Sequence, residues 1–279
     1  MKIIQSPLDL KQQLNELENI FLIPTMGNLH EGHLSLIEEA KKISDNIILT
    51  IFINPIQFNS DRDFKSYPRT LNLDIDLLKK TDVSILFNPI ATDIYTRDSA
   101  LSYKFPIISN QLCGASRPGH FKGVITIIEK LFKLIKPSYV IFGKKDYQQL
   151  FLIKRFVLDS KLPIKIIEAP TIRGINNLAL SSRNNLLSDK EIISAPGLYE
   201  QLKICSNSIL NGAKIVDAEL EAKSKLVKAG WKLDYFEIRR QVDLEKPSYN
   251  DLKLVALGAG SLGKIRLIDN IEFCIPTTY

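Results

Sequence analysis

Up to residue 173, the hydrophobic positions alternate between short apolar runs and longer stretches with helical spacing. The apolar runs predict strands at 19–27, 45–54, 82–89, 138–143 and 163–172. The stretches between them predict helices at 33–43, 70–80, 121–136 and 147–160. Strands that alternate with helices are typical of a parallel sheet with helices on both faces. The first part of the chain is therefore predicted to be α/β and Rossmann-like.

The segment 121–136 carries the clearest helical pattern. Its apolar side chains recur at intervals of three and four residues, as in one buried face of a helix, at Val124, Ile127, Ile128, Leu131 and Ile135. Pro137 is expected to end this helix, because proline cannot continue the hydrogen-bonding pattern.

After residue 173 the order of elements changes. Helical patterns near 188–211 and 214–229 precede three β-like runs, at 231–240, 252–259 and 264–273. Helices followed by strands indicate a smaller α+β domain. A polar, Asn-rich connection at 171–185 joins the two parts. We therefore expect a domain at 1–173 and a smaller C-terminal domain at 174–279.

Composition narrows the class of protein. Of the 279 residues, 45% are hydrophobic and 24% are charged, as in ordinary globular proteins. The apolar stretch 47–53 is too short to span a bilayer, and the N-terminal residues lack the apolar core of a signal peptide. Cys113, Cys205 and Cys274 lie far apart without a CxxC spacing, which favours a reducing compartment. These features predict a cytoplasmic protein.

The net charge of +6 raises the question of a nucleic-acid partner. The Lys and Arg residues are interspersed with acidic ones, and no basic stripe interleaved with aromatic residues is present. Most of these charges are expected to lie on a solvated surface, with a few that bind an anionic small molecule. Nucleic-acid binding is kept as an alternative, one that predicts steep salt dependence.

Two of the three histidines, His30 and His33, lie in the sequence "MGNLHEGH" between a predicted strand and a predicted helix. The zinc-protease pattern HExxH places its histidines four residues apart, whereas these are three apart. The first turn of a helix has unpaired N–H groups and a favourable dipole for anions, so a phosphate is the expected ligand. The alternative is that the imidazoles only cap or pack the turn.

The third histidine, His120, lies in "ASRPGHFKG" beside Arg117 and Lys122. A zinc site built from all three histidines is an alternative on the count of ligands alone. The cationic neighbours favour a phosphate over a metal ion, and a structural role at the turn is a further reading of His120.

Polar residues also follow two of the predicted strands. Lys145, Asp146 and Gln149 lie in "FGKKDYQQL", directly after the strand at 138–143. Asn54 and Gln57 lie in "NPIQF", after the strand at 45–54. Ligands of open α/β sheets bind at the carboxyl ends of the strands, so these side chains are candidates for a binding site. Asp146 is equally well explained as a helix N-cap.

The sequence "LSSRN" provides two hydroxyl groups and a guanidinium at Ser181, Ser182 and Arg183. Short hydroxyl donors and a bidentate guanidinium suit phosphate oxygens, although the same residues occur in ordinary surface turns.

Seven blocks in order resemble the pantothenate synthetase (pantoate–β-alanine ligase) family. They are "PTMGNLHEGHLSLI", "NPIQF", "YPRT", "RPGHFKGV", "FGKKDYQQL", "LSSRN" and "GKIRLIDN". This family belongs with nucleotidyltransferases whose "HIGH"-like and "KMSKS"-like motifs correspond here to "HEGH" and "LSSRN". The resemblance implies that ATP activates pantoate as pantoyl adenylate, which β-alanine then converts to pantothenate and AMP.

The resemblance also assigns residues to roles around ATP. The catalytic group it implies consists of His30, His33, Lys145 and Arg183. The ATP-binding group it implies consists of Met26, His33, Gly143, Lys145, Asp146, Ile172, Ser181, Ser182 and Arg183. Within this group, Asp146 contacts the ribose and the backbone near Gly143 and Ile172 borders the adenine. Mg²⁺ is expected to be held mainly by the triphosphate, without a dedicated protein site.

For pantoate, the resemblance implies Gln57 and Gln149 as hydrogen-bonding residues, with Asn54 and Met26 lining the pocket. A homodimer is expected from the family, with no nucleic-acid or membrane partner. The chain departs from the common pattern at Cys113, where many members have Glu, at "GINN" (174–177), and at Leu180, where many have Met.

Overall fold

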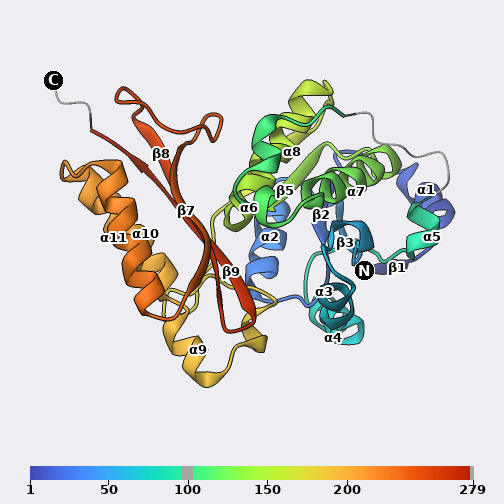
Figure 1. Ribbon diagram of the computed structural model, residues 1–279. Coiled ribbons are helices and arrows are strands. Elements are labelled where there is room, and N and C mark those ends of the chain that lie inside the picture. The colour runs from blue at the N-terminus through green and yellow to red at the C-terminus, as the bar shows by residue number, and fades with distance from the viewer. Residues whose placement is uncertain (96–102, 277–279) are drawn as a thin grey trace. The chain divides into compact units, whose positions relative to one another are not determined.

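The computed structural model describes residues 1–95 and 103–276 and divides the chain into two compact units (Figure 1). The first unit consists of residues Met1–Ser109, Arg117–Lys144 and Gln149–Thr171. The second unit consists of Asn110–Ser116, Lys145–Gln148 and Ile172–Tyr279. Two short segments that precede residue 149 therefore pack with the C-terminal part of the chain.

A six-stranded sheet, parallel throughout, forms the centre of the first unit. Its order is β1-β4-β3-β2-β5-β6. The strands are β1 (Lys2–Ile4), β2 (Phe21–Thr25), β3 (Ile47–Ile51), β4 (Ile85–Phe87), β5 (Tyr139–Gly143) and β6 (Lys165–Ala169). The predicted parallel α/β fold is confirmed, and β1 is an edge strand that the sequence pattern did not predict.

Helices cover both faces of this sheet, as predicted. The helices of this part of the chain are α1 (Pro7–Leu14), α2 (Glu31–Lys41), α3 (Asp61–Ser66), α4 (Leu71–Leu78), α5 (Ala91–Ile94), α7 (His120–Ile135) and α8 (Tyr147–Asp159), although α3 contributes no side chain to the packing on the sheet. Side chains of α1, α7 and α8 form one hydrophobic cluster with alternate strand residues such as Leu22 and Ile48. Their strand neighbours Phe21 and Ile47 face the other side and pack with side chains of α2 and α4. Both faces of each central strand are therefore buried.

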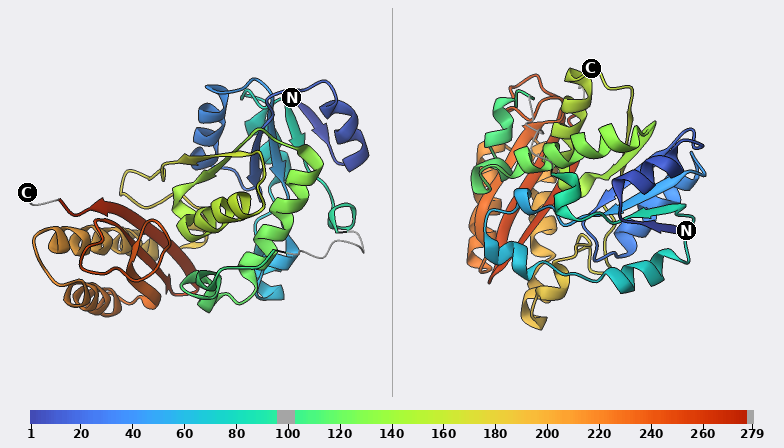
Figure 2. Two further views of the ribbon diagram at one scale, coloured as in Figure 1. Left: turned by 90° about the horizontal axis from the view of Figure 1, so that it is seen from above. Right: turned by 90° about the vertical axis from the view of Figure 1, so that its right-hand side faces the viewer.

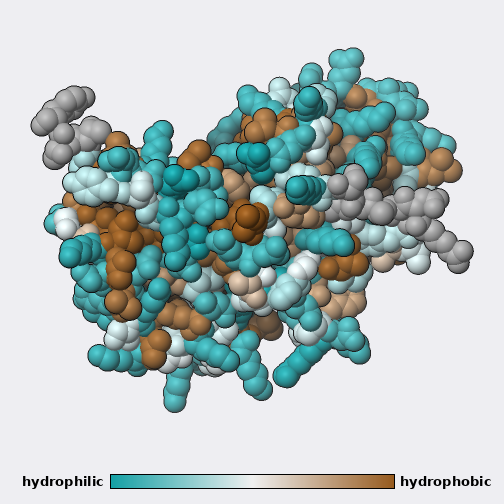
Figure 3. All heavy atoms as spheres, turned by 45° about the horizontal axis from the view of Figure 1, so that its top comes forward, coloured by the Kyte–Doolittle hydropathy of each residue, from teal (hydrophilic) through white to brown (hydrophobic). Residues whose placement is uncertain are grey.

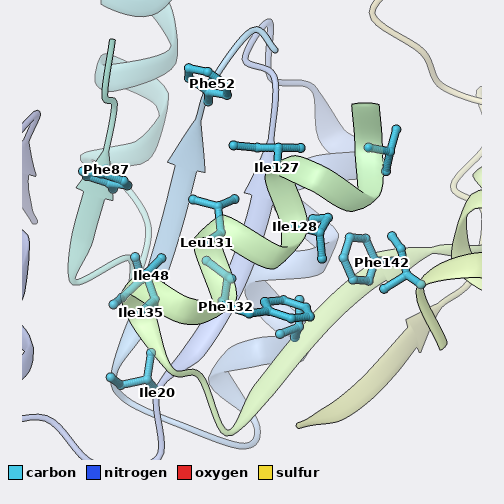
Figure 4. Packing of buried hydrophobic residues seen from close by; sticks show 14 of the residues in the cluster. Ile20, Ile48, Phe52, Phe87, Ile127, Ile128, Leu131, Phe132, Ile135 and Phe142 are labelled. Atoms are coloured by element: carbon cyan, nitrogen blue, oxygen red, sulfur yellow. The ribbon is translucent and has the colours of Figure 1, made fainter. Parts of the chain in front are cut away.

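Helix α7 provides the largest part of the first cluster. Ile127, Ile128 and Leu131 project from it towards the sheet, where Ile48 and Phe87 lie (Figure 4). All five residues of the predicted apolar face are buried. The helix ends at Ile135, just before the proline that was expected to stop it.

The strand order reverses direction at β2. From β2 the chain builds outward through β3 and β4, then crosses back so that β5 pairs with the other side of β2, with Phe21 opposite Tyr139. The carboxyl ends of two such neighbouring strands form the usual ligand-binding position of an open α/β sheet. The loop that follows β2 carries His30, and β5 ends at Gly143.

The second unit contains an antiparallel sheet in the order β7-β8-β9. Its elements are α6 (Cys113–Ser116), α9 (Asp189–Ser194), α10 (Gly197–Leu210), α11 (Ile215–Lys228), β7 (Lys232–Arg240), β8 (Lys253–Leu262) and β9 (Ile265–Cys274). Helices α10 and α11 lie side by side against one face of this sheet (Figures 1 and 2). The predicted α+β architecture is confirmed.

The helical pattern at 188–211 forms two helices rather than one. Helix α9 ends at Ser194 and α10 begins at Gly197, with Pro196 between them. Proline and the residue before it disfavour a continuous helix, which explains the break. Helix α9 begins with a capping box in which Ser188 and Glu191 satisfy each other's backbone N–H groups.

Short 3₁₀ segments occur at η1 (Pro55–Gln57), η2 (Ile107–Asn110), η3 (Lys144–Asp146) and η4 (Asn184–Leu186). The face drawn in Figure 3 is mainly hydrophilic, with smaller hydrophobic areas between. Within residues 1–95 and 103–276, no helix is long and apolar enough to cross a membrane.

Candidate active site

The two histidines of "HEGH" define the start of α2. His30 is the N-cap residue, and its Nδ1 accepts a hydrogen bond from the backbone N–H of Gly32 at 3.1 Å. The Nδ1 of His33 accepts one from the backbone N–H of His30 at 3.3 Å. The two rings lie 4.2 Å apart, centroid to centroid. The histidines therefore form a reciprocal capping pair, which the sequence reading had treated as an alternative to ligand binding.

This capping arrangement fixes the tautomer of both rings. A nitrogen that accepts a hydrogen bond carries no proton, and a neutral imidazole has its proton on the other nitrogen. Each ring therefore carries its proton on Nε2. Capping and ligand binding are compatible, since each imidazole uses Nδ1 for the helix and carries an N–H donor at Nε2.

A buried carboxylate on α4 holds the loop that leads to these histidines. Asp74 Oδ2 accepts from the N–H of Asn28 at 2.9 Å, and Oδ1 accepts from the N–H of Leu29 at 2.8 Å. Thr70 Oγ1 donates to the same carboxylate at 3.2 Å. Gly27 has φ +77°, and a Cβ there would lie 3.0 Å from Asp74 Oδ2. Glycine is needed at this position for both its conformation and its small size.

The side chains after β3 form a directed hydrogen-bond network. Tyr95 donates its hydroxyl proton to Asn54 Oδ1, and Asn54 Nδ2 donates to Gln57 Oε1 at 2.9 Å. Gln57 Nε2 lies 3.0 Å from Met26 Sδ. Burial raises the pKa of Tyr95 well above its usual range, so this phenol remains a donor. The network brings together three of the predicted pantoate residues: Met26, Asn54 and Gln57.

His120 supports this network from the start of α7. Its Nδ1 lies 2.8 Å from the carbonyl oxygen of Gln57, and its Nε2 lies 2.9 Å from Arg117. Since the carbonyl only accepts and the guanidinium only donates, His120 carries its proton on Nδ1. Both ring nitrogens are engaged in protein contacts. His120 therefore has the structural role, and the three-histidine zinc site is not supported.

Gly123, one turn further along α7, allows η1 to pack closely. A Cβ at this position would lie 2.5 Å from the carbonyl oxygen of Ile56 and 2.7 Å from the Cα of Gln57. The carbonyl oxygen of Gly123 also accepts from Asn54 Nδ2 at 3.0 Å. Helix α7 thus fixes the backbone on which Gln57 is carried.

The second unit contains the lysine, serine and arginine residues predicted to bind phosphate and the aspartate predicted to contact the ribose. Lys145 and Asp146 lie in η3, and the carbonyl oxygen of Lys145 accepts from Asn270 Nδ2 at 3.0 Å. The next residue, Tyr147, donates its hydroxyl proton to Glu272 at 2.7 Å. Asp146 is exposed.

The segment 172–184 forms a turn followed by a loop at 181–183, which we call the serine loop. The N–H of Gly174 donates to the carbonyl of Leu178, and Asn177 adopts φ +65°. "GINN" thus forms a closed turn in which Asn takes the left-handed conformation it tolerates. Ser181 Oγ accepts from the N–H of Arg183 at 3.2 Å. Ser181, Ser182 and Arg183 are all half-buried.

The unusual Cys113 occupies a polar cluster in the second unit. Its Sγ lies 3.2 Å from a guanidinium nitrogen of Arg266, which also forms an ion pair with Asp234 at 2.6 Å. Tyr235 lies 3.5 Å from the same sulfur, and burial raises the pKa of this phenol well above its usual value. The thiol therefore occupies a place beside an arginine where a carboxylate would be well matched.

The structure thus brings the predicted residues together within each unit separately. His30, His33, Met26, Asn54, Gln57, Gly143 and Gln149 belong to the first unit. Lys145, Asp146, Ile172, Ser181, Ser182 and Arg183 belong to the second.

Several supporting residues were missed from the sequence: Asp74, Tyr95 and Asn270. Asp74 had a detectable signal. With Leu71, Ile75 and Leu78 it completes the i, i+3, i+4, i+7 spacing of a buried helical face. An acidic residue in such a face needs buried hydrogen-bond donors.

A pair of imidazoles at the first turn of a helix, placed where the strand order of a parallel sheet reverses, is typical of an α/β protein that binds nucleotide phosphates. The sequence profile described as pantoate-beta-alanine ligase matches residues 2–272. The chain belongs to the pantoate–β-alanine ligase family.

Similar proteins share nearly the full length. The chain is 43% identical to a pantothenate synthetase of Neisseria meningitidis, covering 99% of this chain and 100% of the relative. A crystal structure of pantothenate synthetase from Thermus thermophilus matches with a TM-score of 0.92 and 34% identity, covering 97% and 99% of the two chains. A pantoate–β-alanine ligase from Francisella tularensis, described as complexed with beta-gamma ATP and beta-alanine, matches with a TM-score of 0.81 and 37% identity over 97% of each chain.

Proposed function

We propose that this chain carries out the reaction of its family, the ATP-dependent condensation of pantoate with β-alanine, through the residues described above. A carboxylate oxygen of pantoate attacks the α-phosphorus of ATP, and the bond to the bridging oxygen breaks to release pyrophosphate. The amine of β-alanine then attacks the acyl carbon of pantoyl adenylate. AMP leaves, a proton is released, and pantothenate is formed.

The observation that carries this proposal is the shared tautomer of His30 and His33. Two Nε2–H donors at the first turn of α2 can hydrogen-bond phosphate oxygens on which negative charge increases during attack. Because each Nδ1 is held by a backbone N–H, the donors are oriented before the substrate arrives. We assign these two residues to the α- and β-phosphates.

Lys145 and Arg183 supply positive charge to phosphate oxygens, and Ser181 and Ser182 supply hydroxyl donors. We assign Asp146 to the ribose, the backbone at Gly143 and Ile172 to the adenine, and Met26 to a shared position beside ATP and pantoate. The side chains assigned to phosphate oxygens are donors rather than the carboxylates that Mg²⁺ prefers, and the carboxylate of Asp146 is assigned to the ribose. We therefore propose that Mg²⁺ would be held mainly by the triphosphate, where it would neutralise part of the phosphate charge.

The hydrogen-bond network orients Gln57 for pantoate. Its Oε1 is occupied by Asn54 Nδ2, so the amide offers an N–H to the ligand. An N–H donor suits the carboxylate or a hydroxyl oxygen of pantoate. Gln149 is assigned to the same ligand, with Asn54 and Met26 beside it.

We further propose a nucleotide- and pantoate-binding domain at 1–173 and a smaller lid domain at 174–279; the compact units differ from this division in that 110–116, 145–148 and 172–173 pack with the second unit. A homodimer is proposed from the family. A cytoplasmic location is proposed because the three cysteines are free thiols.

The test of this function is ATP–pyrophosphate exchange, measured with and without pantoate. Exchange that requires pantoate, and AMP release that requires both pantoate and β-alanine, are the expected results. Exchange that proceeds equally well without pantoate would refute the proposed first step.

The roles of the histidines are tested separately. We expect His30→Ala and His33→Ala each to lower exchange by about 100-fold, the usual effect of removing a preorganised donor. Long-range ¹H–¹⁵N spectra of the wild-type protein should show both imidazoles protonated on Nε2. Spectra that place the proton on Nδ1 would contradict the assigned geometry.

A further inference from the structure

The block "GKIRLIDN" resembles its family counterpart, but the resemblance assigned no role to any of its residues. It contains Asp269 and Asn270, which are adjacent on β9 and buried, at 5% and 7% exposure. Adjacent residues of a strand point to opposite faces of the sheet. Each of these two side chains contacts a different segment of the proposed ATP site.

Asn270 contacts the segment that carries the phosphate-binding lysine. Its Nδ2 donates to the carbonyl oxygen of Lys145 at 3.0 Å. Two residues along β9, Glu272 accepts from Tyr147 at 2.7 Å. Since residues 270 and 272 share one face of the strand, this face of β9 holds residues 145 and 147 in register.

Asp269 contacts the segment that leads into the serine loop. Arg173 donates to its two carboxylate oxygens at 2.6 and 2.8 Å, a bidentate ion pair with both side chains largely buried. The Arg173 guanidinium also lies 3.5 Å from the ring centroid of Tyr199 on α10 and donates to the carbonyl of Asn177 at 3.1 Å. A guanidinium with this many partners has little freedom.

We infer that Asn270 and Asp269 are positioning residues for ATP, which hold Lys145 and the serine loop on opposite faces of one strand. The pairing of β9 with β8, with Asn270 opposite Leu257 and Asp269 opposite Gly258, makes this strand a fixed support. Because the two contacts lie next to each other on it, the lysine and the serine loop are set at a fixed separation. This inference rests on the proposed role of Lys145 in binding ATP.

The test is a double-mutant cycle on ATP affinity, measured by calorimetry on the full-length protein. Asn270→Asp keeps the size of the side chain but places an acceptor against the carbonyl of Lys145. We expect it to raise the Kd for ATP about tenfold, as for a lost buried hydrogen bond with its partner left unsatisfied. In a Lys145→Ala background, the same change should raise the Kd by less than about twofold, because the two residues act together.

The matched control is Asp234→Asn. It removes a carboxylate from another Arg–Asp ion pair of the same sheet, Asp234–Arg266, which contacts neither ATP segment. We expect its Kd for ATP to equal that of the wild type. The KM for pantoate should be unchanged in both Asn270→Asp and Asp234→Asn.

Three outcomes separate the possibilities. If Lys145→Ala leaves ATP binding unchanged, the proposed ATP site itself is wrong. If Lys145→Ala weakens binding but Asn270→Asp does not, or if the two effects simply add, the positioning role is refuted. If Asn270→Asp does not fold, Asn270→Ser serves in its place, with an expected loss of about threefold.

The Asp269 contact has its own readout. Asp269→Asn keeps one oxygen acceptor but turns an N–H₂ group toward the Arg173 guanidinium. We expect the Kd for ATP to rise about tenfold and the rate at which a protease cleaves the serine loop to increase. Unchanged ATP affinity with increased cleavage would show that the ion pair only stabilises the fold, and would overturn this part of the inference.

Discussion

Replacing Asp74 with Asn provides a sensitive test of how the histidine loop is held. The carboxylate accepts backbone N–H groups of Asn28 and Leu29 at 2.9 and 2.8 Å and the hydroxyl of Thr70 at 3.2 Å. Asn has nearly the same volume but only one oxygen. One of the two backbone N–H groups would therefore face an N–H₂ group.

The magnitude follows from these contacts. A hydrogen bond to a charged group contributes about 1.5–3 kcal/mol, and one such bond is lost. If the loop keeps its position, the free energy of unfolding should fall by about 2 kcal/mol. If the loop relaxes instead, His30 moves with it and the loss appears in catalysis. We expect the second outcome to dominate, because the loop already contains residues in the left-handed conformation, Gly27 and Asn28.

The assay compares kcat, KM for ATP and thermal midpoint in Asp74→Asn and Asp76→Asn. Asp76 lies on the same helix but is exposed, in a surface ion pair with Lys79 at 2.9 Å. Such pairs contribute less than about 1 kcal/mol, so this control should behave as the wild type. We expect Asp74→Asn to lower kcat/KM for ATP by about 30-fold, which corresponds to about 2 kcal/mol of transition-state stabilisation. The KM for pantoate should be unchanged. A variant that loses thermal stability but keeps its kcat/KM would refute the reasoning.

Three further predictions concern Gly123, Tyr95 and the reactivity of the cysteines. Gly123→Ala should raise the KM for pantoate several-fold and destabilise the fold by about 2 kcal/mol, because the added Cβ meets the backbone of η1. In the control Gly197→Ala the added Cβ has room, so neither the KM nor the stability should change. Equal effects of the two substitutions would contradict the prediction. Tyr95→Phe should raise the KM for pantoate about threefold without changing that for ATP, measured by initial rates. Burial raises the pKa of the Cys205 thiol to about 12, so at about pH 8 a disulfide reagent should modify the exposed Cys274 rapidly and Cys205 only after unfolding.

Much of the fold was predictable because its signals are local. Helix α7 was predicted from five apolar residues at helical spacing, and all five are buried. The boundary between α9 and α10 was missed, since the apolar spacing continues across a proline whose effect on the backbone was not taken into account. Strand β1 was missed because three residues carry too little pattern, and its partner β4 lies far along the chain.

The supporting groups of the site were less predictable. Asn54, Gln57, Lys145 and Asp146 come shortly after β3 or β5, so their placement at the carboxyl ends of these strands was predictable. Asp74, Tyr95 and Asn270 act on residues that lie 45, 41 and 125 positions away in the chain. Contacts at that separation depend on tertiary packing, for which a single sequence has no periodic signal. The family resemblance named the motifs but gave no reason for "GKIRLIDN".

The three histidines do not share one tautomer, because their ring nitrogens have different hydrogen-bond partners. In His30 and His33, backbone N–H groups occupy Nδ1, so the proton is on Nε2. In His120, a backbone carbonyl faces Nδ1 and a guanidinium faces Nε2, so the tautomer is reversed and both nitrogens are engaged. A negatively charged carboxylate must approach a negatively charged triphosphate in the proposed reaction. In that proposal, the N–H donors of His30 and His33 hydrogen-bond the phosphate oxygens as their charge increases, and the positive charges assigned to Lys145 and Arg183 reduce the repulsion. A proton on Nδ1 in either member of the pair would remove one of the two hydrogen bonds that cap α2.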